Sequence, residues 1–175
     1  MQPYPSHLVQ PLALKDGTAI TIRPISPADA GIEQEFVRNL SGESSYFRFM
    51  SSVRELSPRM LSHFTQVDYD RHMALIAVSK QGGKEIQVGV ARYVAAEDRQ
   101  VCEFAIVIAD DWQRKGLGAQ LMRSLISSAR AAGIRVMRGE VLAGNQHMLQ
   151  FTAKLGFGAR FAEGDPRMIR VEIDL

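Results

Sequence analysis

The chain has 175 residues, of which 46% are hydrophobic and 23% are charged, with a formal net charge of +2. This length suits one domain that buries a core without metal or disulfide cross-links. The basic residues are dispersed, which excludes the concentrated positive face of a nucleic-acid-binding protein. Cys102 is the single cysteine, so the composition suits a reducing compartment. No apolar run has the length of a signal peptide core or a transmembrane helix, so we expect a cytoplasmic protein without membrane contact.

The N-terminal third combines one strand with two helices. Residues 1–13 contain three prolines and are expected to form a loose arm. Polar and apolar residues alternate over 18–23, which predicts a strand. Ser26, followed by a proline, starts a helix whose apolar residues recur every four positions as far as Leu40. A second helix is expected to start at Ser57, again followed by proline.

The middle of the chain changes from helical to extended periodicity. Short apolar runs over 73–79, 86–94 and 101–108 are separated by short polar turns, which is typical of an antiparallel meander. The rest of the chain predicts a helix over 116–132, a strand over 134–142, a helix over 148–155 and a strand over 169–175. We therefore expect one α+β domain over 14–175, with a mixed, mostly antiparallel sheet flanked by helices.

One stretch predicts a phosphate site. The strand over 101–108 and a polar corner lead into Gln113, Arg114, Lys115, Gly116, Leu117, Gly118 and Ala119, where a helix begins. A helix start leaves backbone N–H groups without partners and carries partial positive charge, so it favours phosphate. Gly116 and Gly118 have no Cβ, which lets a diphosphate approach the backbone. On the short motif alone, a tight turn with a solvated Arg114-Lys115 pair explains the pattern equally well. Two other phosphate motifs do not fit. The P-loop requires lysine where this chain has Ala119, and the dinucleotide fingerprint requires a third glycine where it has Leu121.

The run from Ile106 to Gly118 resembles motif A of the GNAT N-acetyltransferase superfamily, whose core is Arg/Gln-x-x-Gly-x-Gly/Ala. The similarity covers roughly residues 14–162 and includes Asn145 with Gly156-Phe157 after it. Within the superfamily the chain is similar to the catalytic domain of Pat-type bacterial protein lysine acetyltransferases. The matching words are Ile22-Arg23-Pro24, Ser44-Ser45-Tyr46-Phe47-Arg48-Phe49, Thr65-Gln66-Val67-Asp68-Tyr69-Asp70, Glu103-Phe104-Ala105 and Glu140-Val141-Leu142-Ala143-Gly144-Asn145.

This resemblance implies a fold and a coenzyme site. It implies a sheet that splays between the fourth and fifth strands, with the pantetheine arm of acetyl-CoA pairing along the fourth strand as an added strand would. Carried over to this sequence, Ile106 and Ile108 offer backbone groups to that arm, and an N–H near Val107 polarises the thioester carbonyl. The residues from Gln113 to Ala119 hold the diphosphate. Asn145 either binds the pantetheine arm or caps the helix that follows it.

Glu103 is the candidate general base. A lysine with a pKa of about 10.4 must lose a proton before it attacks a thioester. Glu103 begins the strand that faces the thioester and occupies the acidic position of the Glu-Phe-Ala word, and burial beside Phe104 would make it a stronger base. The alternative is an edge-strand glutamate in a salt bridge. In many family members a tyrosine seven residues after the asparagine is the general acid that protonates the leaving thiolate, but this chain has Thr152 there. Without that tyrosine, the leaving thiolate takes its proton from solvent or from another donor, or the modest pKa of the thiol, about 8.5, makes an acid unnecessary.

The other residues with reactive or ionisable side chains each have two plausible roles or none in the reaction. Tyr46, Tyr69 and Tyr93 are possible proton donors or packing residues. Asp68 and Asp70 either frame an acceptor lysine or belong to a polar loop. Cys102 is interpreted as a buried bystander. The histidines show no metal-ligand spacing, so no metal is expected.

The sequence therefore predicts acetyl-CoA-dependent acetylation of a primary amine on a protein lysine. A small amine (a polyamine, amino acid or aminoglycoside) and a non-catalytic acyl-CoA sensor remain alternatives. The oligomeric state is not predicted.

Overall fold

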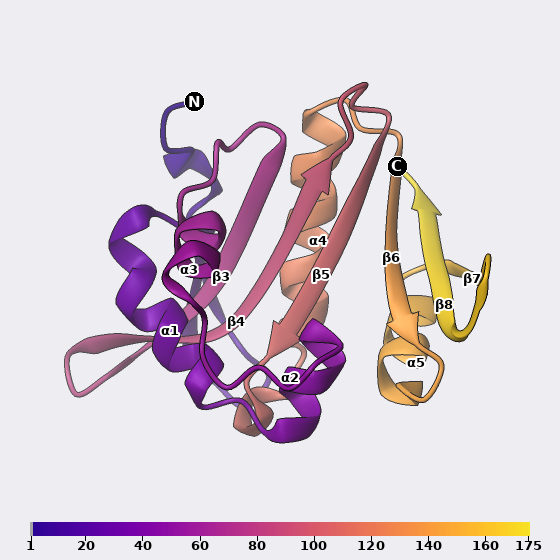
Figure 1. Cartoon of the computed structure of the whole chain (residues 1–175). Helices are drawn as coiled ribbons and strands as arrows, with labels where there is room; N and C mark the ends of the chain where they lie inside the picture. Colours follow the sequence, from indigo (N-terminus) through magenta and orange to yellow (C-terminus); the bar gives the residue numbers. More distant parts are fainter. Residues whose placement is uncertain (1) are drawn as a thin grey trace.

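The computed structural model describes residues 2–175, and a single eight-stranded sheet runs through them (Figure 1). The strand order is β1-β2-β3-β4-β5-β6-β8-β7. The strands are β1 Gln10–Ala13, β2 Ala19–Pro24, β3 His72–Gln81, β4 Lys84–Ala95, β5 Val101–Ile108, β6 Val136–Leu142, β7 Gly158–Ala162 and β8 Asp165–Asp174. All neighbouring pairs are antiparallel except β5 and β6. The predicted α+β class and mixed, mostly antiparallel sheet are confirmed.

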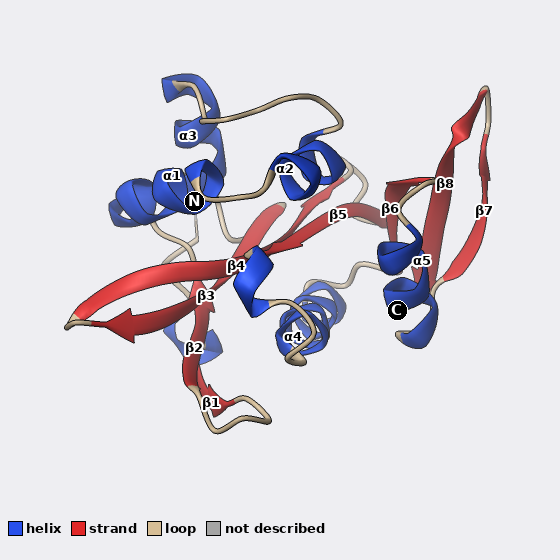
Figure 2. Ribbon diagram, turned by 90° about the horizontal axis from the view of Figure 1, so that it is seen from below, coloured by secondary structure: helices blue, strands red, loops and turns tan. Residues whose placement is uncertain are grey.

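Helices cover both faces of this sheet, as the view along it shows (Figure 2). One face carries α1 Ala30–Arg38, α2 Gly42–Phe49 and α3 Pro58–Thr65, and the other carries α4 Leu117–Ala131 and α5 Gln146–Lys154. Two hydrophobic clusters result. The larger one lies under α4 and includes Leu121 and Leu125, both fully buried. The smaller one lies under α1–α3 and includes Phe36. The leucines that recur along 117–125 are therefore the inward face of α4, as their helical spacing predicts.

The parallel pair β5–β6 is the feature that positions the site. Its register covers only three residue pairs, Val101–Val136, Cys102–Met137 and Glu103–Arg138. Beyond Glu103 the two strands separate. Because β1 was not predicted, β5 and β6 are the fourth and fifth of the predicted strands, and the predicted splay between them is confirmed. Phe104 fills the start of the gap, because a Cβ placed on Gly139 of β6 would lie only 2.7 Å from its ring. Glycine at 139 therefore admits the aromatic ring between the diverging strands.

The N-terminal arm is more structured than expected. Residues 10–13 of the predicted loose arm form β1, which pairs with β2 at the edge of the sheet. The hydroxyl of Tyr4 donates a hydrogen bond of 2.9 Å to the carbonyl of Pro24, and its ring packs edge-on against Tyr69. Leu8 and Leu12 pack against the larger core cluster. These apolar contacts anchor a segment whose prolines suggested an unattached chain.

A buried polar network lies beneath the helices α1–α3. Arg92 of β4 forms an ion pair of 3.3 Å with Glu33 of α1, and both side chains are at most 6% exposed. The guanidinium also lies 3.3 Å from Nε2 of His72 and donates to the carbonyl of Phe64. Burial, reinforced by Arg92 and His63, lowers the pKa of His72 from 6.5 to about 4. The folded protein therefore favours the neutral form of the His72 imidazole.

This network makes stability depend on pH. Below pH 6.5 the unfolded chain protonates His72, whereas the folded chain resists protonation until about pH 4, so stability is lost as the pH falls. Between pH 7 and pH 4.5 the imidazole should remove about 2–3 kcal/mol from the free energy of unfolding. Urea unfolding of wild type and His72→Gln at both pH values checks this. A His72→Gln variant that loses as much stability as wild type over this interval would refute the assignment.

Candidate functional site

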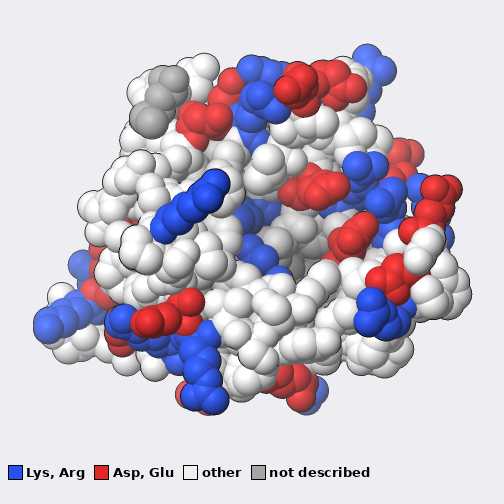
Figure 3. All heavy atoms as spheres, in the orientation of Figure 1, with Lys and Arg blue, Asp and Glu red and all other residues white. Residues whose placement is uncertain are grey.

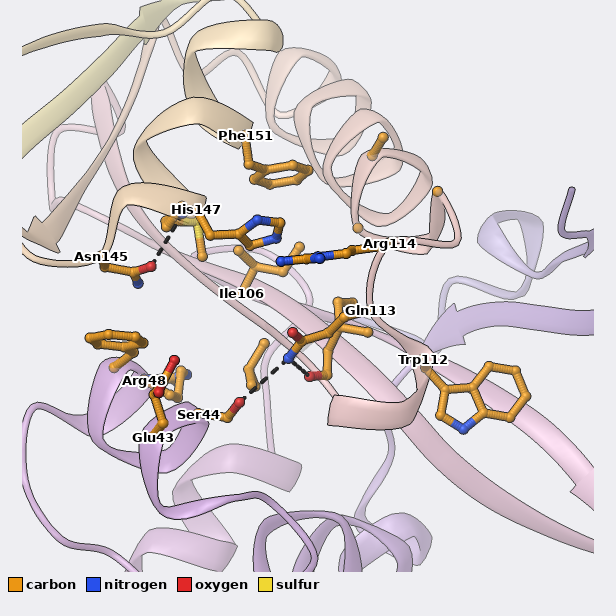
Figure 4. Close-up of a pocket in the computed structure, with 17 residues that line it drawn as sticks. Glu43, Ser44, Arg48, Ile106, Trp112, Gln113, Arg114, Asn145, His147 and Phe151 are labelled. Atoms are coloured by element: carbon orange, nitrogen blue, oxygen red, sulfur yellow. Dashed lines mark hydrogen bonds between the residues drawn. The ribbon is translucent and has the colours of Figure 1, made fainter.

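A cavity of about 330 Å³ opens beside the splay, and segments far apart in the sequence line it. Its lining residues come from α2, the open part of β5, the turn before α4, the first turn of α4, and α5 (Figure 4). A smaller cavity of about 50 Å³ continues from it between β5 and β6. The two share Phe47, Arg48, Ile106, Asn145 and Met148. The space-filling view shows a hollow in the middle of this face, with charged side chains along its rim (Figure 3).

The structure brings together most of the residues that the sequence predicted for coenzyme binding. Nine of the eleven line the larger cavity, namely Ile106, Val107, Ile108, Gln113, Arg114, Gly116, Gly118, Ala119 and Asn145. Leu117 does not, because its side chain is 1% exposed within the core. Lys115 does not either, since it forms an ion pair of 3.5 Å with Asp16 and lies over the Trp112 ring. Lys115 and Leu117 can therefore contribute only backbone groups to a ligand in this cavity.

The start of α4 has several features that favour an anion. Gly116 precedes the helix with φ +85°, a left-handed conformation that favours glycine. No side chain caps the helix, and among residues 2–175 no acceptor is recorded for the N–H groups of Leu117, Gly118 or Ala119. Arg114, which also has a positive φ, points from the turn across the cavity towards His147 of α5 (Figure 4). Free amides, helix dipole and guanidinium together favour a phosphate group at this end.

The open edge of β5 supplies a second set of backbone groups. The N–H of Ala109 bonds to the carbonyl of Val88, so residues 109, 107 and 105 turn their backbone groups towards β4. The backbone groups of Ile106 and Ile108 therefore point away from β4, into the splay. The Ile108 carbonyl already accepts a hydrogen bond of 3.0 Å from the side chain of Gln113. Because the amide of Val107 faces β4, the amide available to a thioester near it is that of Ile106 or Ile108.

Helix α2 is hydrogen-bonded directly to residues 110–113, which lead into the turn before α4. The Asp110 carboxylate accepts hydrogen bonds from the Ser41 amide, at 3.1 Å, and from the Ser44 hydroxyl, at 3.0 Å. Burial raises the pKa of Asp110, but these hydrogen bonds outweigh it, and the net shift is downward. Gln113 reaches the same Ser44 hydroxyl at 3.4 Å (Figure 4). The sequence did not predict α2. It offered the cavity residues Ser44, Phe47 and Arg48 only within a family word, without a role, and it missed Glu43.

Two carboxylates lie near the splay. The side chain of Glu103 is 67% exposed and forms an ion pair of 3.4 Å with Arg138, its neighbour on β6. The expected burial beside Phe104 is not found, because Glu103 is the last residue of the paired segment and faces solvent. Glu103 lines neither cavity. Glu140 lines the smaller cavity and accepts a hydrogen bond of 3.2 Å from Arg170. The sequence offered Glu140 only within a family word, without a role.

The other candidates lie away from the cavities. Thr152 is 1% exposed and donates to the Leu149 carbonyl within α5. Tyr69 donates to the Ile25 carbonyl, and burial raises the pKa of Tyr69 and of Tyr93. Asp68 accepts three backbone hydrogen bonds in its own loop, and Asp70 pairs with Arg99.

Two further expectations concern Cys102 and Asn145. Burial raises the pKa of Cys102 to about 12, so its thiol stays protonated at neutral pH, as expected of a bystander. Asn145 caps α5 by accepting from the Met148 amide at 3.2 Å and also lines both cavities. Among residues 2–175, no group of three or more potential metal ligands comes together, and no helix is long and apolar enough to cross a membrane.

Comparison with known proteins agrees with this geometry. Residues 37–157 match the model of the acetyltransferase (GNAT) family. The acetyltransferase PA5475 of Pseudomonas aeruginosa is 39% identical over 145 residues, which cover 83% of this chain and 78% of the relative. The acetyltransferase Pat of Mycolicibacterium smegmatis is 29% identical over 166 residues. That match covers 94% of this chain but only 48% of the relative, so the chain spans about half the length of Pat.

A solved structure extends the comparison to the whole fold. The crystal structure of the GNAT domain of S. lividans PAT superimposes with a TM-score of 0.90 at 28% sequence identity, covering 99% of this chain and 100% of that one. The family match, the relatives and the cavity agree with one another. The chain belongs to the GNAT family of acetyltransferases, which use acetyl-CoA as the acetyl donor.

Proposed function

We propose that this protein transfers the acetyl group of acetyl-CoA to the side-chain amine of a protein lysine. The observation that carries the proposal is a single cavity that joins the uncapped start of α4 to the open edge of β5. The first suits a diphosphate and the second suits an extended amide-containing arm. The similarity to Pat-type domains supports lysine as the acceptor.

The coenzyme would lie between the two halves of the sheet. Its diphosphate would accept hydrogen bonds from the amides of Gly118 and Ala119, with Arg114 contributing positive charge. The pantetheine arm would pair with backbone groups of Ile106 and Ile108, and one of their amides would polarise the thioester carbonyl. Since the two cavities meet at Ile106, the acceptor amine would enter from the smaller cavity, on the side away from the diphosphate.

Glu103 is proposed as the general base for the incoming amine. The amine is an ammonium at neutral pH, and its deprotonation costs roughly 4–5 kcal/mol at pH 7 for a pKa of about 10.4. Glu103 stands where β5 leaves β6, and its exposed carboxylate can pass the proton to solvent. The amine then attacks the thioester carbon, and the nitrogen of the tetrahedral intermediate gives up its second proton to solvent. The C–S bond breaks as the intermediate collapses to an amide and the coenzyme A thiolate, which takes up a proton from solvent. The thiol's own pKa of about 8.5 makes that thiolate a tolerable leaving group without a tyrosine acid.

The acceptor is tested directly. Wild-type protein incubated with radiolabelled acetyl-CoA and lysine-containing proteins should transfer label to lysine side chains faster than to polyamines, free amino acids or aminoglycosides. Mass spectrometry of the products identifies the acetylated atom. Transfer confined to small amines would replace protein lysine by the small-molecule alternative. Coenzyme binding without any transfer would favour the sensor.

We further propose that residues 14–175 act as one acetyltransferase domain in the cytoplasm. The sheet through β2–β8 lies within these residues and supports the single unit, to which the N-terminal arm adds β1 as an edge strand. The lone buried Cys102 suits a reducing compartment.

A further inference from the structure

A positive charge at the junction of the two cavities lacks a counter-charge. Arg48 of α2 lines both cavities, and no carboxylate lies within ion-pair distance of it among residues 2–175. No hydrogen bond from its guanidinium to the described residues is recorded either. The guanidinium lies over two aromatic rings, with its carbon 4.9 Å from the Phe49 ring centroid and 5.7 Å from that of Phe64. Stacking against rings supports the cation only in part.

The groups packed around Arg48 do not neutralise it. Arg92 also lies over the Phe64 ring, at 4.5 Å, and is itself positive. The carboxylate of Glu33 is already shared between Arg92 and the Gln87 amide. His72 is neutral above about pH 4 because burial lowers its pKa. The cluster of Arg48, Arg92, Glu33 and neutral His72 therefore carries one net positive charge. Burial, aided by repulsion from Arg92, also lowers the pKa of Arg48 to about 10.

Arg48 lies at the junction of the two cavities, near the proposed position of the thioester. The smaller cavity is lined by Phe104 and Glu140 but by no residue of 113–119, so it lies on the side of the proposed thioester position away from the proposed diphosphate position. Arg48 belongs to both cavities and hence lies where acyl group and acceptor meet. A partly desolvated cation in such a place is stabilised by an anion that arrives with the ligand. Guanidinium is also the side chain best shaped for bidentate binding of a carboxylate.

We propose that Arg48 recognises a carboxylate at the acyl-transfer end of the site. This inference rests on the proposed function, because it assigns substrate chemistry to the same cavity. Two sources present the same group: an acyl chain that ends in a carboxylate, or an acceptor with an acidic group beside its amine. Arg48 would thus determine specificity and would not take part in proton transfer.

Paired measurements separate the two sources. In the first, calorimetry gives the Kd values of succinyl-CoA and butyryl-CoA, which differ by the terminal carboxylate. In the second, kcat/KM is compared for two lysine peptides with Glu or Gln beside the lysine, with acetyl-CoA as donor. Wild type should prefer the carboxylate form in at least one pair, and Arg48→Met should reduce that preference at least tenfold. Arg48→Lys should restore part of it.

Controls keep the outcomes distinct. Arg54→Met removes an exposed arginine that lines neither cavity and should keep the wild-type preferences. If Arg48→Met does not fold, as judged by circular dichroism, Arg48→Lys is compared with wild type instead, and a smaller loss of the preference for the carboxylate form is expected. Normal binding of butyryl-CoA with no Arg48-dependent preference in either pair would overturn this inference and leave the proposed function standing. Failure of wild type to bind any acyl-CoA would overturn both.

Discussion

Glu103→Gln is expected to lower kcat at least hundredfold while the Kd for acetyl-CoA stays within twofold of wild type. General-base catalysis contributes about 10²–10⁴ in rate, and glutamine cannot accept the proton. The coenzyme affinity should hold, because Glu103 lines neither cavity and bonds only to Arg138. The measurements are steady-state kinetics with a lysine acceptor at pH 7–9 and calorimetry with acetyl-CoA. The deficit should shrink at high pH, where more of the amine is already neutral.

Glu140→Gln is the matched variant, since it removes a carboxylate from the neighbouring strand. If Glu103 is the base, Glu140→Gln should change KM for the cationic acceptor more than kcat, because Glu140 lines the smaller cavity where the acceptor would enter. The reverse pattern, with kcat lost in Glu140→Gln and kept in Glu103→Gln, would transfer the role of base to Glu140. Full activity of both variants would exclude carboxylate assistance at this splay.

Gly118→Leu is expected to weaken acetyl-CoA binding at least tenfold, a loss of about 1.4 kcal/mol. A Cβ at Gly118 would already lie 3.3 Å from the Phe151 ring, so a leucine must displace that ring or extend into the cavity. Either change obstructs the amides at the start of α4. Calorimetry with acetyl-CoA and with pantetheine shows which part of the ligand loses affinity, because only acetyl-CoA carries the diphosphate.

A second glycine substitution controls for helix effects. Gly31 of α1 is exposed, and a Cβ there would meet nothing within 4 Å, so Gly31→Leu should bind acetyl-CoA like wild type. Unchanged affinity in Gly118→Leu would place the diphosphate elsewhere and contradict the assigned site.

Most strands and helices could be predicted because their side chains alternate or recur with a clear period. The strand over 101–108 matches β5 at both ends, and the helix over 116–132 matches α4 to within one residue. Helix α2 was missed because its first turn is polar and small, and one apolar face is not evident in eight residues. Strand β7 was missed because nearly all of it is exposed at the edge of the sheet. Where burial gives no pattern, periodicity gives no signal.

From periodicity and local motifs the site was predictable only where it is contiguous, and Asn145 was added by the family resemblance. The motif at 113–119 contains its own physical reason, since a glycine-rich turn before a helix favours phosphate. The side chains from α2 and α5 reach the cavity only through the tertiary fold. A partial signal existed, because His147, Met148 and Phe151 stand close together on a helix that Asn145 starts. The exposure of Glu103 depends on where β5 leaves β6, which no local pattern encodes.

The splay leaves the protein with an interrupted sheet. With only three β5–β6 residue pairs, the edge of β5 beyond Glu103 has no partner strand on that side, and such open edges are places through which chains associate. A pantetheine arm in the gap would occupy that edge, so the coenzyme would serve the folded protein as a ninth strand as well as a donor. Bound acyl-CoA would then also stabilise the fold, by a free energy that grows with the logarithm of the ratio of its concentration to the dissociation constant.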